Sequence, residues 1–155
     1  MSRAQKVIDG LNSFIILVSL GMVVWGCSML IKDHDVYNTP NTCPEHYKNM
    51  YIYLWISVGI AMLAVIYKMP FLKCGMAIYC VFHILNIGIL GYNTYILSDL
   101  SSSCKSFYHN EYYNIWILFI GILIYQLIVL LVGLVNLIYY ILSISNCIHS
   151  DEYYY

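Results

Sequence analysis

Long apolar runs alternate along this chain with short polar connections. The runs contain no Asp, Glu, Lys or Arg within them. A helix rises about 1.5 Å per residue and the hydrocarbon core of a bilayer is about 30 Å thick, so about 18 to 25 uncharged residues suffice to cross it. The sequence therefore predicts four transmembrane helices, at residues 11–31, 50–67, 74–97 and 114–142.

The connections between these runs leave no room for a soluble domain. Residues 32–49 and 98–113 form two of them, and residues 68–73 form a tight turn that contains Pro70. Helices joined by such short connections pack antiparallel to their neighbours. We therefore expect an all-α integral membrane protein: a single domain over residues 1–155, folded as a compact antiparallel bundle of four transmembrane helices with both termini on the same side. The fourth run exceeds the bilayer thickness, so its end should protrude before a short polar, Tyr-rich tail at 143–155.

Composition agrees with a membrane protein and narrows the function. Hydrophobic residues make up 61% of the chain and charged residues only 10%, against about 25% charged in soluble domains. With seven basic residues and a net charge of -1, no basic patch is available for nucleic acid. The chain has no nucleophile elbow, P-loop, HExxH motif or intramembrane carboxylate pair, so we expect neither enzymatic activity nor a cofactor.

Charged and aromatic residues near the helix ends bear on orientation. Basic residues are retained on the cytoplasmic side of a membrane. Four of them fall on the terminal side of the predicted bundle and three on the other: Arg3, Lys6, Lys68 and Lys73 against Lys32, Lys48 and Lys105. This bias favours cytoplasmic termini. The three tryptophans are expected at the opposite interface as headgroup-level anchors: Trp25, Trp55 and Trp116.

Two of the six cysteines lie outside the apolar runs, in the two connections on the outer side. Cys43 and Cys104 are candidates for a disulfide that joins these connections in an oxidising compartment. An alternative is a zinc site, because Cys43, His46, Cys104 and His109 supply the two thiols and two imidazoles of a tetrahedral site. Free thiols and exposed histidines are the third alternative. The other four cysteines are expected to act as small apolar residues in or beside helices.

Four uncharged polar residues lie within the runs. Counted along the helices, Ser19, His83 and Gln126 fall near one depth in the inner half of the membrane, and Asn86 lies one turn further out on the face of His83. Such side chains usually hydrogen-bond across helices, each bond contributing about 0.6 kcal/mol, so we interpret them as a packing layer. The alternative makes His83 a protonatable residue of a permeation path. No span holds a charged partner for it, which disfavours ion-coupled transport.

Four spans with cysteines in both outer connections resemble the topology of tetraspanins, claudins and MARVEL-type proteins. The chain lacks the large second outer loop and Cys-Cys-Gly signature of tetraspanins, and the first-loop Trp and paired-Cys pattern of claudins. Its richness in Ile, Tyr and Asn is similar to that of proteins from AT-rich genomes. Among these are large DNA viruses, whose virions often contain small multi-span proteins in an internal membrane.

These observations favour a structural or interaction component of a larger membrane assembly, in a virion internal membrane or in another membrane complex. The expected partners are the lipid bilayer and other membrane proteins or copies of this chain. The alternative is a small channel or transporter, homo-oligomeric in one version, with a polar path near His83, Asn86 and Gln126. Small residues such as Gly88, Gly91 and Gly121 mark places where helices can approach closely.

Overall fold

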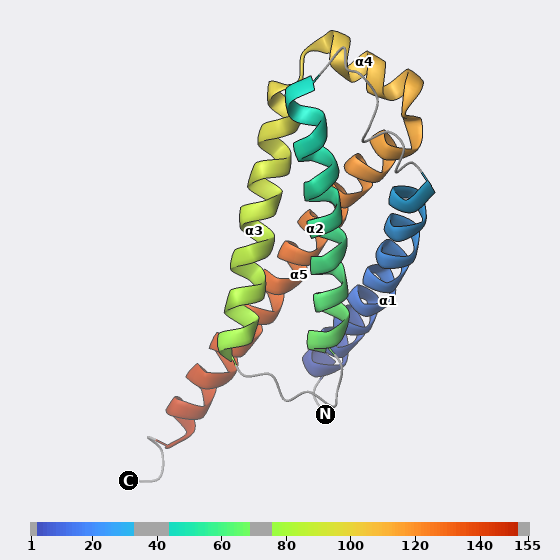
Figure 1. Ribbon diagram of the computed structural model, residues 1–155. Helices are drawn as coiled ribbons and strands as arrows, with labels where there is room; N and C mark the ends of the chain where they lie inside the picture. The colour runs from blue at the N-terminus through green and yellow to red at the C-terminus, as the bar shows by residue number, and fades with distance from the viewer. Residues whose placement is uncertain (1–2, 33–43, 69–75, 152–155) are drawn as a thin grey trace.

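The computed structural model describes the backbone of residues 3–32, 44–68 and 76–151, and within these the side chains of residues 5–32, 49–66 and 79–143. The described chain is helical and contains no strand. Its five helices are α1 (Arg3–Lys32), α2 (Pro44–Lys68), α3 (Met76–Asp99), α4 (Ser102–Glu111) and α5 (Tyr113–Asp151). Figure 1 shows α1, α2, α3 and α5 as long rods, with α4 lying across their upper end.

Four of these helices are long and apolar enough to cross a membrane. The qualifying segments lie in α1, α2, α3 and α5, at Gln5–Lys32, Asn49–Ile66, Tyr79–Asp99 and Tyr113–Ser143. The prediction of four long apolar helices is therefore confirmed, and the pattern is that of a multi-pass membrane protein. The connection and turn predicted at 32–49 and 68–73 lie mostly outside the described residues.

The helix α4 was not predicted, since residues 98–113 were expected to be a plain connection. Ser101 precedes it in an extended conformation, and its Oγ accepts a hydrogen bond from the backbone N–H of Cys104 at 3.3 Å. This is the N-cap arrangement that satisfies a free donor at a helix start. Tyr112 ends the helix, and its carbonyl then accepts from the N–H of Trp116 at 3.0 Å, so α5 begins directly after the bend.

The helix α5 is longer than predicted. It continues through most of the segment that was expected to be a tail and ends only at Asp151. Residues 143–151 contain neither Pro nor Gly, the two residues that most strongly terminate a helix. Its 39 residues give a length of about 58 Å at the standard rise, nearly twice the hydrocarbon thickness. Figure 1 shows its last turns projecting beyond the ends of the other helices.

The helices contact one another in a closed circuit: α1 with α2, α2 with α3, α3 with α5, and α5 with α1. Their buried side chains form two apolar clusters. The first lies toward α4 and includes Leu30, Met50, Leu54, Ile96, Tyr108, Ile115, Leu118, Phe119 and Leu123. The second lies further from α4 and includes Ile15, Ile60, Ala61, Ala64, Phe82, Tyr125, Val129 and Val132. Lipid tails are as apolar as these side chains, so close packing must hold such helices together.

Two glycines allow α1 to approach its neighbours. A Cβ atom on Gly26 would lie 2.5 Å from Cγ2 of Val58 in α2. A Cβ atom on Gly121 of α5 would lie 2.8 Å from Cζ3 of Trp25. Both separations are shorter than carbon atoms tolerate, so each glycine is required for the observed spacing. The Trp25 indole thus occupies a recess on α5 that only a glycine leaves open.

Candidate functional site

A layer of uncharged polar side chains separates the two apolar clusters. Ser57 of α2, Asn86 and Asn93 of α3, and Gln126 of α5 are each at most 2% exposed. Gln126 follows residues of the first cluster along α5 and precedes residues of the second, and Ser57 has the same position on α2. We call Ser57, Asn86, Asn93 and Gln126 the amide layer. It introduces polar groups into the apolar core on three helices.

Asn93 is the centre of the amide layer. Its Nδ2 donates to Oγ of Ser57 at 3.3 Å and to Oε1 of Gln126 at 3.2 Å. Two turns further from α4, Nδ2 of Asn86 donates to the backbone carbonyl of Gln126 at 3.3 Å. The hydroxyl of Ser57 donates in turn to the backbone carbonyl of Tyr53 at 2.7 Å. The layer therefore connects α2, α3 and α5 by side-chain hydrogen bonds.

Part of the hydrogen-bonding capacity of this layer is unused. Among the described residues, Oδ1 of Asn86, Oδ1 of Asn93 and Nε2 of Gln126 are buried and have no hydrogen-bond partner. A buried amide atom without a partner costs about 1–3 kcal/mol, and lipid supplies no replacement for water. The layer thus offers two acceptors and one donor group inside the protein.

The predicted residue Ser19 is buried but does not join the amide layer. Its Oγ is 2.7 Å from the hydroxyl of Tyr125, with either oxygen able to donate. This bond connects α1 with α5, and α1 also contacts α2. Of the four predicted residues, the structure brings Asn86 and Gln126 into direct contact, with Ser19 attached to the residue beside Gln126.

The predicted residue His83 is half-buried one turn from Asn86 on α3. Its ring packs against the backbone of α5, where a Cβ atom on Gly133 would lie 2.8 Å from both ring nitrogens. The Tyr79 ring is tilted against it with centroids 4.4 Å apart, and the Phe82 ring meets it edge-on at 5.1 Å. The hydroxyl of Tyr79 donates to the carbonyl of Gly133 at 2.5 Å. His83 is thus held in an aromatic recess opposite a glycine.

Further hydrogen bonds join α1 to α5 beyond His83. Nδ2 of Asn136 donates to Oδ1 of Asn12 at 2.9 Å. The hydroxyl of Tyr139 donates to Oε1 of Gln5 at 2.9 Å. Polar contacts between helices therefore continue from the amide layer toward the end of the molecule that lies away from α4. Toward α4, the hydroxyl of Tyr51 in α2 donates to the backbone carbonyl of Leu30 in α1 at 2.7 Å, within the first apolar cluster.

The sequence reasoning did not single out Asn93 or Ser57. The signal for Asn93 was available, because it follows Asn86 by seven positions and such residues share a helix face. Ser57 lies within the predicted helix at residues 50–67. Its place in the layer depends on how α2 is rotated against α3, which a single sequence does not specify.

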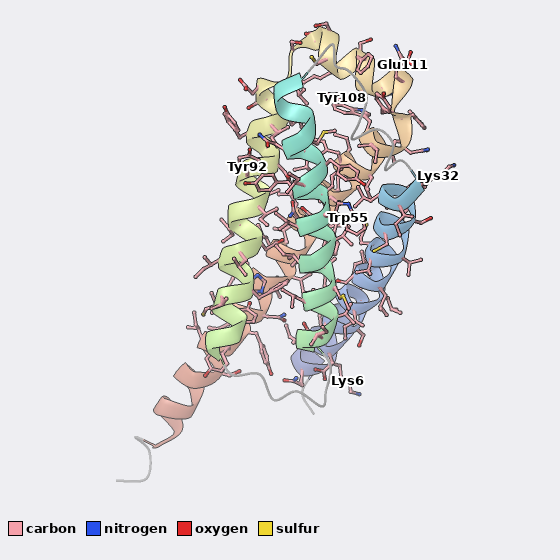
Figure 2. All side chains as sticks on the ribbon, viewed as in Figure 1. Lys6, Lys32, Trp55, Tyr92, Tyr108 and Glu111 are labelled. Carbon is pink, nitrogen blue, oxygen red and sulfur yellow. The ribbon has the colours of Figure 1, made fainter. Side chains whose placement is uncertain are left out.

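The predicted tryptophan anchors differ in their surroundings. Trp25 and Trp116 are half-buried and pack against the first apolar cluster. Trp55, labelled on α2 in Figure 2, is 38% exposed. Because α2 begins at Pro44, Trp55 is further from the helix start than the apolar run implied. Whether the three rings lie at one membrane interface stays a prediction.

The cysteine site is only partly within the described residues. Cys104 is half-buried on α4 and is disulfide-bonded. Cys43 and the side chain of His46 lie outside the described residues, so the pairing with Cys43 and the zinc alternative stay predictions. His109 is exposed, with its ring 5.5 Å from that of Tyr113. In the described part of the chain, no three His, Cys, Asp or Glu residues are grouped so as to hold a metal.

Beneath α4, Tyr108 is almost fully buried in the first apolar cluster (Figure 2). The ring of Phe107 meets those of Tyr108 and Tyr112 edge-on, with centroid distances of 5.8 Å and 5.6 Å. Burial raises the pKa of Tyr108 to about 12, and the neighbouring Tyr112 adds to the rise. The phenol therefore stays neutral at any physiological pH and anchors α4 over the ends of the long helices.

The chemistry of the layer is hydrogen bonding without charge. Among the described residues, the buried polar side chains are Ser19, Ser57, Asn86, Asn93 and Gln126, and none of these is acidic or basic. Comparison with known proteins finds no matching family model, no matching curated protein and no matching solved structure.

Proposed function

We propose that this protein is a structural component of a larger membrane assembly. In this proposal the four long helices cross the bilayer as an antiparallel bundle with both termini on the cytoplasmic side, and outward helix faces bind other membrane proteins. The observation that carries it is the separation of surfaces. The amide layer is buried between helices, whereas many of the exposed side chains on the spans are large and apolar.

The interior gives more support to a structural role than to a channel. Asn86 and Gln126, which the channel alternative places along a polar path, are at most 1% exposed and hydrogen-bonded to each other's helices. Toward α4 the described core is apolar and closely packed around Leu54, Ile96 and Phe119. A continuous aqueous path needs polar or open positions toward both ends. The contacts of a single chain favour use of these residues for helix packing.

The outward face of α3 is our candidate for the binding surface. The spanning segments of α3 and α1 are the least buried, at 22% each, against 50% in α2 and in α5. Ile84, Gly88, Gly91 and Tyr95 recur at helical spacing and are all exposed. No atom lies within 4 Å of a Cβ built on either glycine. Small residues on a lipid-facing surface let another helix approach closely, so the partner we propose is a transmembrane helix.

Site-specific photocrosslinking in the native membrane tests this surface. A photoreactive residue replaces Ile84, which is 66% exposed on α3, or Leu131, which is 62% exposed on α5 and serves as the control. We expect Ile84 to label one recurring membrane protein and Leu131 to label mostly lipid. Lipid adducts alone at both positions would contradict the proposal. Adducts only between copies of this chain would favour the oligomeric alternative.

A pair of glycine variants controls for unspecific damage. Gly88→Leu should abolish the crosslinks from Ile84, because a bulky side chain separates the two helices. Gly59→Leu places the same side chain at an exposed position on α2 where a Cβ also meets no atom within 4 Å, and it should leave the crosslinks intact. If both variants behaved alike, the α3 face would not be the binding surface.

We also propose that Cys43 and Cys104 are joined, which would place the two outer connections in an oxidising compartment. The disulfide-bonded state of Cys104 supports this pairing. Blocking free thiols in the intact membrane before lysis, followed by mass spectrometry of the peptides, tests it. A linked Cys43–Cys104 peptide is expected. Alkylation of both cysteines would contradict the pairing and would leave the zinc and free-thiol alternatives.

A further inference from the structure

Two of the long helices, α1 and α3, turn most of their surface away from the bundle. Each contacts α2 and α5, so they lie at opposite corners of the circuit, and Figure 1 shows them on opposite sides of the bundle. Only 22% of either spanning segment is buried. Figure 1 also shows that both helices run in the same direction, toward α4. In the described chain, both outward faces are therefore exposed at the same time.

The levels of α1 and α3 can be compared through α2, which contacts both of them. Gly26 of α1 packs against Val58 of α2. Asn93 of α3 donates to Ser57, the neighbouring residue of α2. Gly26 and Asn93 therefore lie at about the same level, and Asn93 follows Gly26 by 67 positions in the sequence. Because the rise per residue is the same in both helices, other residues 67 positions apart also lie at similar levels.

Exposed residues recur with identical spacing on the outward sides of both helices. Five of them on α1 form what we call the α1 face: Leu17, Gly21, Val24, Ser28 and Lys32. The residues 67 positions later form the α3 face: Ile84, Gly88, Gly91, Tyr95 and Asp99. Within each set the residues are three or four positions apart, so they follow one side of the helix. Each residue of one face thus has a counterpart at its own level on the other face.

The central parts of the two faces fit each other in shape. If α1 of one copy of this chain packs in parallel against α3 of another copy, residues at equal levels lie opposite one another. Gly21 then meets Gly88, and a Cβ atom on either glycine would meet no atom within 4 Å. Val24, which is 71% exposed, meets Gly91. Glycine at these positions lets the two helices approach closely, as packing in lipid requires.

The ends of the two faces nearest α4 fit each other in size and charge. The small Ser28 lies opposite Tyr95, which is 54% exposed. The cation Lys32 lies opposite the carboxylate of Asp99, and both residues are exposed. Pairing α1 with α1 would instead place Lys32 against Lys32, and pairing α3 with α3 would place Asp99 against Asp99. Opposite charges attract and like charges repel, so the two faces favour an unlike pair.

We propose that the α3 face binds the α1 face of a second copy of this chain. The inference rests on the proposed function, because it names the transmembrane helix that the α3 face receives. Each copy uses a different face toward each neighbour, so the contact is head-to-tail and can repeat along a row. Asn86 and Gln126 stay buried within each copy, so the contact forms no polar path between copies. The row therefore differs from a homo-oligomeric channel.

Photocrosslinking between two differently tagged copies in the native membrane tests this contact. One copy carries a photoreactive residue in place of Ile84, and mass spectrometry maps its adducts on the other copy. We expect adducts on α1 around Leu17. A photoreactive residue at Leu17 should in turn label α3 around Ile84. Adducts between copies at any other face would overturn the inference and would favour the oligomeric channel.

The same experiment separates this inference from the proposed function. If Ile84 labelled only a different membrane protein, the α3 face would remain a binding surface, but its partner would not be a second copy. Lipid adducts alone at Ile84 and Leu17 would overturn both proposals.

A glycine variant in the copy without the photoreactive residue gives a sharper test. Gly21→Leu should abolish adducts from Ile84 of the other copy, since a bulky side chain on α1 separates the two helices. Gly59→Leu is the matched control on α2 and should leave the adducts intact. A Cβ atom on either glycine meets no atom within 4 Å, so both variants fit the fold of their own chain. Unchanged adducts with Gly21→Leu would overturn the inference.

Exchange of the two charges identifies the faces that pair. With the photoreactive residue at Ile84, Asp99→Lys in the same copy should lower the adduct yield about two- to fivefold, the effect expected from an exposed ion pair. Adding Lys32→Asp in the other copy should restore the yield, because the two charges are again opposite. A yield that did not fall in the single variant, or did not recover in the pair, would overturn the proposed contact.

Discussion

The hydrogen bond between Asn93 and Gln126 can be measured by a double-mutant cycle. Asn93→Leu removes the donor and leaves Oε1 of Gln126 buried without a partner, like the Nε2 atom beside it. Ser57 loses one bond but still donates to a backbone carbonyl. An unsatisfied buried group costs about 1–3 kcal/mol, so we expect Asn93→Leu to lower the free energy of unfolding by about 2 kcal/mol.

The partner variant should cost less. Gln126→Met removes the acceptor but leaves Asn93 bonded to Ser57 at 3.3 Å, so we expect a loss of about 1 kcal/mol, the usual net value of one hydrogen bond. The double variant removes both polar groups and should cost less than the two losses added together. Their difference, the coupling energy, should fall between about 0.6 and 1.7 kcal/mol, as for hydrogen bonds between helices in membranes.

Unfolding in mixed micelles of a mild detergent and sodium dodecyl sulfate, followed by tryptophan fluorescence, gives the four free energies. The cycle isolates the pairwise energy only if each single variant keeps the helices in place. Near-ultraviolet circular dichroism of the folded proteins is the control for that condition. Strict additivity, with a coupling energy of about zero, would refute the reasoning that these two amides stabilise the fold through each other.

Other features of the structure give further predictions. Gly121→Ala should lower the free energy of unfolding by about 1–3 kcal/mol, because the added methyl group overlaps the Trp25 ring. The control Gly59→Ala adds a methyl group that meets no atom, so it should be neutral or stabilising by up to about 1 kcal/mol. Unfolding in detergent compares the two variants. Ser101→Ala removes the N-cap of α4 and should cost that helix about 1 kcal/mol, seen as faster hydrogen exchange in its first turn. The pKa of Tyr108, raised by burial from 10.0 to about 12, lies above its value in the unfolded chain, so its contribution to stability is complete below pH 10 and is lost as the pH rises toward 12. The ultraviolet titration difference between the wild type and Tyr108→Phe should show one phenol ionising in that range, and ionisation near pH 10 would contradict the burial.

The long helices could be predicted because the membrane imposes one strong requirement. A spanning segment must satisfy its backbone internally and carry an apolar surface, and both conditions are visible in local sequence. The shorter α4 could not be found in this way, since its ten residues are polar overall and it depends on a cap at Ser101 and on the burial of Tyr108. The length of α5 was underestimated for a related reason. The apolar run ends near Leu142, but residues 143–151 contain no Pro or Gly that would end the helix there.

Position along a helix led us to expect Ser19, His83 and Gln126 at similar levels, because the rise per residue is fixed. In the structure Gln126 contacts Asn86 and Asn93, whereas His83 packs against Gly133, seven residues further along α5. Which side chains meet depends on how each helix is turned about its axis, and apolar runs with small residues on several faces leave that open. Ser19 therefore bonds to Tyr125 rather than to Gln126, and Asn93 takes the central position.

This dependence on rotation suggests why the amide layer exists at all. Apolar side chains gain little by facing another helix rather than lipid, so the two apolar clusters discriminate weakly among rotations of α3. Asn93 can reach both Ser57 and Gln126 in only one of them. We therefore expect the variant with Asn93→Leu and Gln126→Met to retain its helix content while α3 samples several rotations. Electron paramagnetic resonance distances between spin labels at Ile84 on α3 and Leu131 on α5 would broaden in that variant. A distribution as narrow as in the wild type would show that packing alone sets the rotation.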